Sequence, residues 1–335
     1  MIMNKTFFLT GLFVFVSFIT SAQKINGLSF VASKDSILAN DVSTVIGVNA
    51  NYVALMPFGF IRDLSSPKIF FNTEKQWFGE REQGVIQYAK ELQKRSVRIM
   101  IKPQIWVWKG QFTGYISMHS EEQWKVLEDS YTSFILTYAK TAQTLKADIL
   151  CIGTELEKFV STRPEYWRFL ILKIKKIFKG KLTYAANWDE FKRFPLWDQL
   201  DYIGIDAYFP LTDKKLPSVE EFEAGWEWHK KGIYTIHKRY NRPILFTEYG
   251  YRSVDFTGKE PWNSKRFFGQ VNHQAQINGL QAIHNQFWNE EWFLGGFIWK
   301  WFQKHNRVGG QNDNRFTPQN KPAENLLRNL YRESL

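Results

Sequence analysis

The sequence has a single cysteine, Cys151, which excludes an intramolecular disulfide. Its six histidines form no cluster with one another or with Cys151 at metal-ligand spacing, so we expect no metal site. The chain also lacks a proline-, glycine- or serine-rich linker and any low-complexity tract, which favours one folded domain. No glycine-rich dinucleotide motif follows the first apolar run and no Gly-Lys-Ser/Thr loop occurs, which argues against a nucleotide-binding fold.

Long hydrophobic runs are scarce, and the one near the N-terminus is too short to span a bilayer. Phe7 to Ile19 is 13 residues long, against the roughly 20 that a transmembrane helix needs. It follows Lys5 and precedes the small residues Thr20-Ser21-Ala22, which is the order of a secretory signal peptide. We therefore predict a signal peptide over residues 1–22 and a mature domain over residues 23–335. The mature protein is expected to be periplasmic or secreted, without stable membrane insertion once the signal is removed.

Acidic residues are outnumbered, since 33 aspartates and glutamates face 44 lysines and arginines, for a formal net charge of +11. The positive charges are spread along the chain. The densest basic run lies in and just beyond a predicted helix, where a solvated outer face is the usual explanation; it comprises Lys173, Lys175, Lys176, Lys179 and Lys181. We therefore predict no nucleic-acid partner.

Short apolar runs alternate with helical segments through the mature chain. Eight such runs are predicted as strands: Ile25 to Phe30, Tyr52 to Pro57, Val97 to Pro103, Ile149 to Glu155, Leu182 to Ala186, Tyr202 to Asp206, Pro243 to Glu248 and Gly296 to Trp299. Helical apolar spacing is found between them, at residues 80–95, 121–146, 164–178, 219–240 and 264–287. Eight strand-helix units in about 300 residues predict an α/β fold, a single-domain (β/α)8 TIM barrel.

Aromatic residues are abundant, with 14 tryptophans, 14 tyrosines and 29 phenylalanines. Flat apolar rings with polar edges suit the faces of sugars. Many of these rings follow the second, third and seventh predicted strands, at the end where barrel enzymes build their sites. They are Phe58, Phe60, Phe70, Phe71 and Trp77, then Trp106, Trp108, Phe112 and Tyr115, then Tyr249, Tyr251, Phe256 and Trp262. Together they favour a cleft, although any one ring could simply cover the barrel.

Two glutamates end predicted strands at the same edge. On strict alternation Glu155 shares a face with Cys151 and Gly153, and Glu248 shares a face with Ile244 and Phe246. A carboxylate that closes an apolar strand is costly to desolvate unless it is paired or needed. Two of them on strands four and seven are typical of an acid/base pair, and the alternative is two exposed glutamates at loop entries.

Several short runs, in this order and spacing, resemble the clan A retaining glycoside hydrolases, and within that clan glycoside hydrolase family 113, the β-1,4-mannanase family. The resemblance covers nearly the whole mature chain. The runs are Val53-Ala-Leu-Met-Pro-Phe-Gly-Phe60, Lys102-Pro-Gln-Ile-Trp106, Ile152-Gly-Thr-Glu-Leu156, Asp206-Ala-Tyr-Phe-Pro210 and Thr247-Glu-Tyr-Gly250, with Lys321-Pro-Ala323 before a final helix.

The resemblance implies roles for particular residues. Glu155 would be the general acid/base and Glu248 the nucleophile. Tyr208 matches the tyrosine that hydrogen-bonds the nucleophile, and Trp299 matches the aromatic floor beneath the sugar. Thr154 stands where many clan members have an asparagine that binds the sugar 2-hydroxyl, and its shorter side chain reaches less far.

Four further polar or aromatic residues are candidates for the sugar subsites. Lys102 and Gln104 share the inward parity of the third predicted strand, while Asn187 and Trp188 follow the fifth. Polar packing at the top of the barrel is the alternative role for all four. Asp206 is expected to support neighbouring polar groups.

These observations predict a secreted retaining hydrolase that cleaves β-1,4-mannosidic linkages in mannan or manno-oligosaccharides and needs no metal or organic cofactor. Its partner would be the oligo- or polysaccharide substrate. Glu155 is expected to stay protonated because the anionic Glu248 raises its pKa. A clan A glycosidase for another β-linked hexose, such as a glucan, and an inactive glycan-binding barrel are the alternatives.

Overall fold

A computed structural model describes residues 23–265 and 269–334. The predicted signal peptide, residues 1–22, lies outside the described residues. Within the described part of the chain, none of the helices has the length and apolar character needed to cross a membrane.

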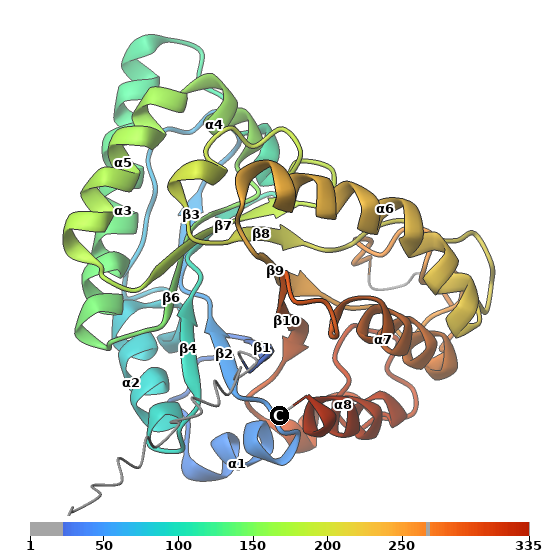
Figure 1. Cartoon of the computed structure of the whole chain (residues 1–335). Coiled ribbons are helices and arrows are strands. Elements are labelled where there is room, and N and C mark those ends of the chain that lie inside the picture. The colour runs from blue at the N-terminus through green and yellow to red at the C-terminus, as the bar shows by residue number, and fades with distance from the viewer. Residues whose placement is uncertain (1–22, 266–268, 335) are drawn as a thin grey trace, which may run out of the picture.

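The described residues form the predicted (β/α)8 barrel, and each of the eight predicted strands is found in it (Figure 1). All neighbouring strands are parallel and the sheet closes in the order β1-β10-β9-β8-β7-β6-β4-β2. The strands are β1 (Ile25–Phe30), β2 (Tyr52–Leu55), β4 (Arg98–Ile101), β6 (Ile149–Thr154), β7 (Lys181–Asn187), β8 (Ile203–Asp206), β9 (Ile244–Tyr249) and β10 (Phe293–Trp301).

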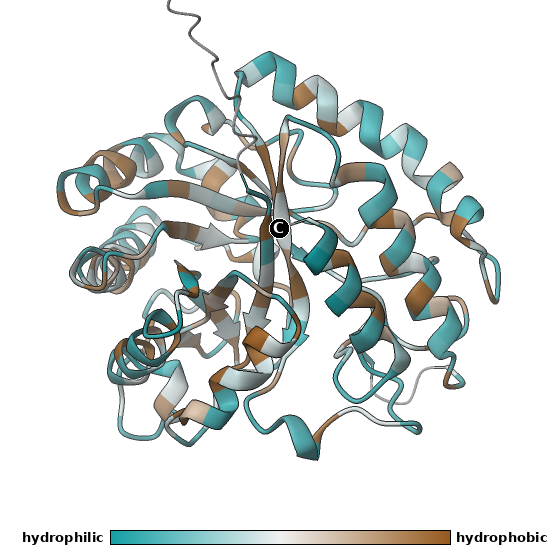
Figure 2. Ribbon diagram, turned by 60° about the horizontal axis from the view of Figure 1, so that its bottom comes forward, coloured by the Kyte–Doolittle hydropathy of each residue, from teal (hydrophilic) through white to brown (hydrophobic). Residues whose placement is uncertain are grey.

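Helices surround the barrel and carry both hydrophobic and hydrophilic residues along their length (Figure 2). They are α1 (Ala39–Gly47), α2 (Glu82–Gln93), α3 (Glu121–Thr144), α4 (Glu157–Thr162), α5 (Pro164–Ile177), α6 (Val219–Tyr240), α7 (His273–Phe287) and α8 (Pro322–Glu333). Short 3₁₀ turns are η1 (Phe78–Glu80), η2 (Thr113–Tyr115), η3 (Trp197–Gln199) and η4 (His305–Arg307).

The predicted helix over residues 264–287 begins later than expected, at His273. The reason is a cap, because the Asn272 side chain accepts a hydrogen bond from the Ala275 N–H at 3.0 Å and satisfies one of the free donors of the first turn. The described residues between Ser264 and Asn272 are not helical.

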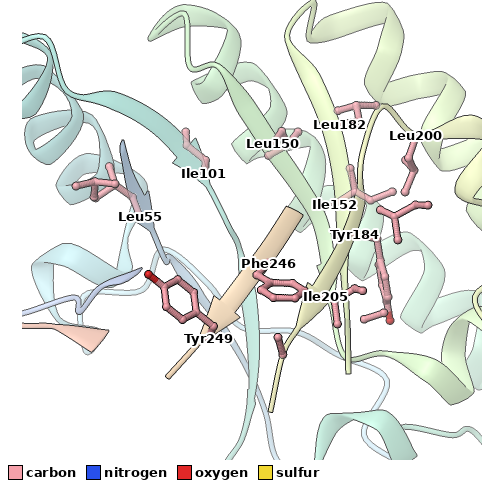
Figure 3. Packing of buried hydrophobic residues seen from close by; sticks show 14 of the residues in the cluster. Leu55, Ile101, Leu150, Ile152, Leu182, Tyr184, Leu200, Ile205, Phe246 and Tyr249 are labelled. Carbon is pink, nitrogen blue, oxygen red and sulfur yellow. The ribbon is translucent and has the colours of Figure 1, made fainter. Parts of the chain in front are cut away.

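Two separate apolar clusters hold the barrel together. The smaller one fills the barrel axis and includes Cys151, Leu245 and Phe297. The larger one lies between the strands and the helices, and Figure 3 shows part of it, with Leu150 and Ile152 of β6 among its members. Leu150 and Ile152 therefore face the helices, as the alternation predicted.

Strand β6 does not keep its alternation up to the glutamate. From Cys151 to Thr154 it advances three residues while β7 advances two, so β6 contains a bulge. A side chain at Gly153 would meet Trp167 on the helix side. The predicted common face of Cys151, Gly153 and Glu155 is therefore wrong, because the extra residue reverses the parity after Cys151.

Strand β9 contains a similar irregularity. Phe246 packs against rings of α6 and α7, and Ile244 belongs to the same outer cluster, whereas Leu245 lies inside the barrel. Between Phe246 and Glu248 the strand advances two residues while β8 advances one, which makes Thr247 an extra residue. The predicted common face of Ile244, Phe246 and Glu248 is therefore wrong, and the bulge turns Glu248 inward.

A second, two-stranded parallel sheet follows the barrel strands β2 and β4. It consists of β3 (Phe58–Ile61) and β5 (Gln104–Val107). Pro57 and Pro103, which lack an N–H, separate these strands from the barrel ladder. The second and third predicted strands thus continue beyond the barrel and extend its upper rim.

Candidate active site

A cleft of about 600 Å³ opens where the barrel strands reach their carboxyl ends. Six of the nine predicted site residues line it: Glu155, Asn187, Trp188, Tyr208, Glu248 and Trp299. They come from β6 to β10 or from the residues that directly follow these strands. The other three, Lys102, Gln104 and Thr154, are not among the residues that line the cleft.

Glu248 accepts hydrogen bonds from three side chains. Its Oε1 lies 2.5 Å from the Lys102 Nζ and 3.1 Å from the Gln104 Nε2, and its Oε2 lies 2.8 Å from the Tyr208 hydroxyl. The side chain is 9% exposed, and Glu248 lines the cleft. All three neighbours donate, so they hold this carboxylate in one orientation with its negative charge compensated.

Lys102 lies beneath Glu248 and has no exposed surface. Its Nζ is also 3.1 Å from Asp206 Oδ1 and 3.3 Å from Asp206 Oδ2, so the cation is shared by two carboxylates. Asp206 receives a further hydrogen bond from the Thr247 hydroxyl at 2.7 Å. Asp206 therefore supports its polar neighbours, and Lys102 orients Glu248 from below.

The surroundings fix the protonation of these donors. Burial opposes the charge on Lys102, but attraction by Asp206 and Glu248 outweighs it, and the pKa of the amine is raised. Burial, with smaller contributions from the same carboxylates, raises the pKa of Tyr208 well above its usual value. Lysine therefore stays charged and the phenol stays protonated, so both donate to Glu248.

The surroundings of Glu155 favour the protonated form of its carboxyl group. Burial is the largest cause that raises its pKa well above the ordinary value, and the negative charges of Asp206 and Glu248 add to it, although Lys102 acts against them. The raised pKa agrees with the expectation from the sequence, but the cause differs because burial exceeds the repulsion by Glu248. Glu155 is thus set up to hold a proton beside a charged carboxylate.

The backbone holds Glu155 in a left-handed conformation, with φ of 51°. Its N–H donates to the Ala185 carbonyl at 2.8 Å, and its own carbonyl accepts from the Thr113 hydroxyl at 3.1 Å. These hydrogen bonds on both sides fix a turn that a non-glycine residue seldom adopts. The turn follows the β6 bulge and brings the side chain to the cleft.

A buried carboxyl group that the sequence did not single out supports the same turn. The Leu156 N–H donates to the Tyr184 hydroxyl at 2.6 Å, and that hydroxyl donates to Glu190 at 2.7 Å. Glu190 also accepts from the Asn187 N–H at 3.0 Å. Burial raises the pKa of Glu190 to about 8. The network joins the turn after β6 to the turn after β7, and no local sequence signal marks it.

Thr154 does not deliver its hydroxyl to the cleft. The side chain lies at the β6 bulge, next to the buried Cys151 thiol. Thr154 is not among the residues that line the cleft, and its hydroxyl oxygen is buried.

Aromatic side chains form the walls and floor of the cleft. Trp188 stacks on Trp262 with ring centroids 5.3 Å apart and an interplanar angle of 16°. Phe112 directly precedes the turn η2 and Tyr115 ends it, and their rings pack edge to face at 5.4 Å on the lining. The sequence grouped these last two and Trp262 among rings that follow strands, and the structure brings them to one cavity.

Trp299 and Phe316 also line the cleft, and Phe316 was not predicted. Its ring packs against Tyr208 at 5.9 Å, a contact between segments that only the closed barrel brings together. Lys300 follows Trp299 and places its Nζ 5.2 Å from the Trp299 ring centroid. Burial lowers the pKa of Lys300, and the nearby Glu248 acts against that shift.

Metal ligands are not grouped in the described part of the chain. Within residues 23–265 and 269–334 no three His, Cys, Asp or Glu side chains are placed to hold a metal ion. The cleft is lined by a carboxyl group with a raised pKa, Glu155, and a hydrogen-bonded carboxylate, Glu248.

Known structures share this fold. A structure described as a complex of a GH113 β-1,4-mannanase superposes with a TM-score of 0.80 at 19% identity, over 92% of this chain and 99% of that one. The GH113 β-mannanase of Alicyclobacillus acidocaldarius in complex with ManMIm gives 0.80 at 20% identity, over 93% and 98%. A β-glucuronidase of Faecalibacterium prausnitzii gives 0.61 at 13%, over 93% of this chain and 49% of that one.

Sequence comparison is more specific than the shared fold. No curated protein sequence matches the chain. The model of Glycoside Hydrolase Family 113 matches residues 34–321, which span most of the described barrel and include both Glu155 and Glu248. The chain therefore belongs to glycoside hydrolase family 113 and is a glycoside hydrolase.

Proposed function

We propose that this hydrolase cleaves β-1,4-mannosidic linkages in mannan or manno-oligosaccharides with retention of configuration. The observation that carries the proposal is one cleft with two unlike carboxyl groups. Glu248 accepts three hydrogen bonds and has its charge compensated, while burial keeps Glu155 protonated. Such a difference between two carboxyl groups assigns the nucleophile and the acid in a double displacement.

In the first step Glu155 gives its proton to the glycosidic oxygen as the bond to the anomeric carbon breaks. The Glu248 carboxylate attacks that carbon and forms a glycosyl ester, and the shortened chain leaves as an alcohol. Tyr208 and Gln104 hold the attacking carboxylate in place through their hydrogen bonds. Lys102 balances its charge before the attack and is left beside Asp206 once the ester has formed.

In the second step Glu155 acts as a general base instead of a general acid. The ionised Glu155 takes a proton from water, the water oxygen attacks the anomeric carbon, and Glu248 is released as a carboxylate. Two inversions give a product with the configuration of the substrate. The aromatic floor at Trp299 and the stacked Trp188 and Trp262 offer flat surfaces to the sugar rings.

Mannan as the substrate is supported by the family and by two similar structures, both of β-mannanases. A reducing-sugar assay on mannan, glucomannan, xylan and β-glucan tests the substrate. We expect turnover of mannan and glucomannan and little of the other two, with none in Glu248→Ala. Turnover restricted to β-glucan would favour a glucan-type enzyme, and binding without turnover would favour an inactive barrel. Proton NMR of the first product tests retention, because a β anomer is expected.

Export is the second part of the proposal, and it rests on the N-terminal sequence pattern. We expect protein recovered from the producing cell to begin at Gln23, since signal peptidase removes residues 1–22. Intact-mass measurement of the soluble extracellular or periplasmic fraction checks this. A chain that begins at Met1 and partitions with membranes would contradict it.

A further inference from the structure

We propose that the open face of the β3–β5 sheet binds the part of a polysaccharide chain that extends away from the cleaved linkage. This inference rests on the proposed function and adds a binding surface outside the catalytic cleft. Four rings define the surface, which we name the outer aromatic face: Phe58 and Phe60 on β3, and Trp106 and Trp108 on and just after β5.

Alternation along the two strands separates a packed face from an open one. Ile105 and Val107 are buried, and a side chain at Gly59 would meet Ile105 and Phe134 of α3. The alternate residues point the other way, and the register pairs Phe58 with Gln104 and Phe60 with Trp106. Trp108 continues this face, because its N–H still donates to the Ile61 carbonyl at 3.0 Å. Each ring of the outer aromatic face is therefore on the side away from the core.

The outer aromatic face is continuous with the catalytic centre through Gln104. The Gln104 amide donates to Glu248 at 3.1 Å, and on the same strand face Trp106 and then Trp108 follow at two-residue intervals. Four residues of a parallel strand span about 13 Å, so the face leads outward from Glu248 over the length of two or more sugar units. A chain held at Glu248 can thus extend along it.

The exposure of these rings is large. Trp106 is 50% and Trp108 is 73% exposed. At its outer end the face borders a hollow of about 740 Å³, which Phe60, Phe70, Trp77 and Trp108 line together with polar side chains. Exposed apolar rings gathered in this way mark an interaction site, because leaving them in water is costly.

The polar groups of the hollow indicate a carbohydrate as the occupant. Thr73, Glu74 and Lys75 line it among the rings, and they offer acceptors and donors for hydroxyl groups. Gln76 and Glu80 also line it, and both already hydrogen-bond within the protein. Sugar rings present flat C–H faces to aromatic rings and hydroxyl edges to such side chains. A purely apolar partner would cover the charged side chains of Glu74 and Lys75, whereas a polysaccharide can contact both the rings and these polar groups.

The test compares long and short substrates in the full mature enzyme. We expect Trp108→Ala to lower the ratio of kcat/KM on soluble mannan to kcat/KM on an aryl β-mannobioside by about five- to tenfold, through a higher KM on mannan. The Trp106→Ala variant should act in the same direction. Trp228→Ala is the matched control, since Trp228 of α6 is 75% exposed and lies outside the cleft and the hollow.

An unchanged ratio in Trp108→Ala, or an equal fall in Trp228→Ala, would overturn the proposal. Failure of the proposed function gives a different result, because the wild-type enzyme would then turn over neither mannan nor the mannobioside. Native gels that contain soluble mannan provide a readout without turnover. There Trp108→Ala should lose retardation that Trp228→Ala keeps, and equal retardation of both variants would also refute the binding surface.

Discussion

Glu248→Ala is expected to lower turnover of every substrate by a factor of at least about 10⁴, because no glycosyl ester can form without the carboxylate. The fold should survive, since Lys102 keeps Asp206 as a partner within hydrogen-bond distance. Rates on mannan and on an aryl mannoside measure the loss, and thermal unfolding serves as the control for folding.

Glu155→Ala should behave differently on a substrate with a good leaving group. An activated aryl mannoside needs little protonation, so the ester with Glu248 still forms while its hydrolysis slows for want of a base. The ester should accumulate as a burst of released aryl alcohol. On mannan, where the leaving group needs the proton, the rate should fall by about 10² to 10⁴.

Azide separates the two roles, because it attacks without a base. In Glu155→Ala it should restore turnover and give a β-glycosyl azide, since two inversions retain configuration. In Glu248→Ala direct attack would give the α product. Reversed anomers, or no rescue of either variant, would show that the acid/base and the nucleophile have been assigned to the wrong strands.

The barrel and both glutamates could be predicted because strand ends are marked locally. Apolar runs of four to eight residues recur through the chain, and Glu155 and Glu248 each close one of them. What alternation could not predict is how the side chains reach the cleft. Each of the two strands contains one extra residue before its glutamate, and a bulge depends on the pairing of neighbouring strands, which is absent from the sequence of one strand.

The hydrogen-bond partners of Glu155 and Glu248 were harder to predict than the two glutamates themselves. Lys102 and Gln104 were predicted as candidates for the sugar subsites, but their hydrogen bonds to Glu248 could not be predicted from the sequence. The buried pair of Tyr184 and Glu190 belongs to a turn after β7, and its link to the Glu155 turn exists only once the barrel has closed. Long-range hydrogen bonds of this kind have no local periodicity to reveal them.

Lys102→Met is expected to have the second large effect. It removes the cation between Asp206 and Glu248 and leaves two buried carboxylates, with Lys300 as the nearby positive group. An uncompensated buried charge costs about 3–5 kcal/mol of stability. Since Glu248 must be ionised to attack, kcat/KM at neutral pH should fall by about 10²-fold or more.

The pH dependence of kcat/KM in Lys102→Met tests whether the cation compensates the charge of Glu248. Burial raises the pKa of Asp206 to about 7, and loss of the cation should raise it further. Removing the positive charge disfavours both neighbouring carboxylates, so the acidic limb of the kcat/KM profile should move to higher pH. Groups whose pKa is raised by folding stabilise the folded state below that pKa and lose this contribution as the pH rises through it. The melting temperature of Lys102→Met should therefore fall more steeply between pH 5 and 8 than that of the wild type.

A second buried lysine, Lys321, provides the control that separates the electrostatic effect of Lys102→Met from the general cost of replacing a buried lysine. Lys321 is also fully buried and lies 2.8 Å from Asp313, away from both glutamates. Lys321→Met should destabilise the protein but leave the acidic limb of the kcat/KM profile in place. If Lys321→Met moves the acidic limb as far as Lys102→Met does, or if neither moves it, Lys102 does not control the charge of Glu248. A shift confined to Lys102→Met would instead identify the shared cation as the reason that Glu248 is ionised while Glu155 holds its proton.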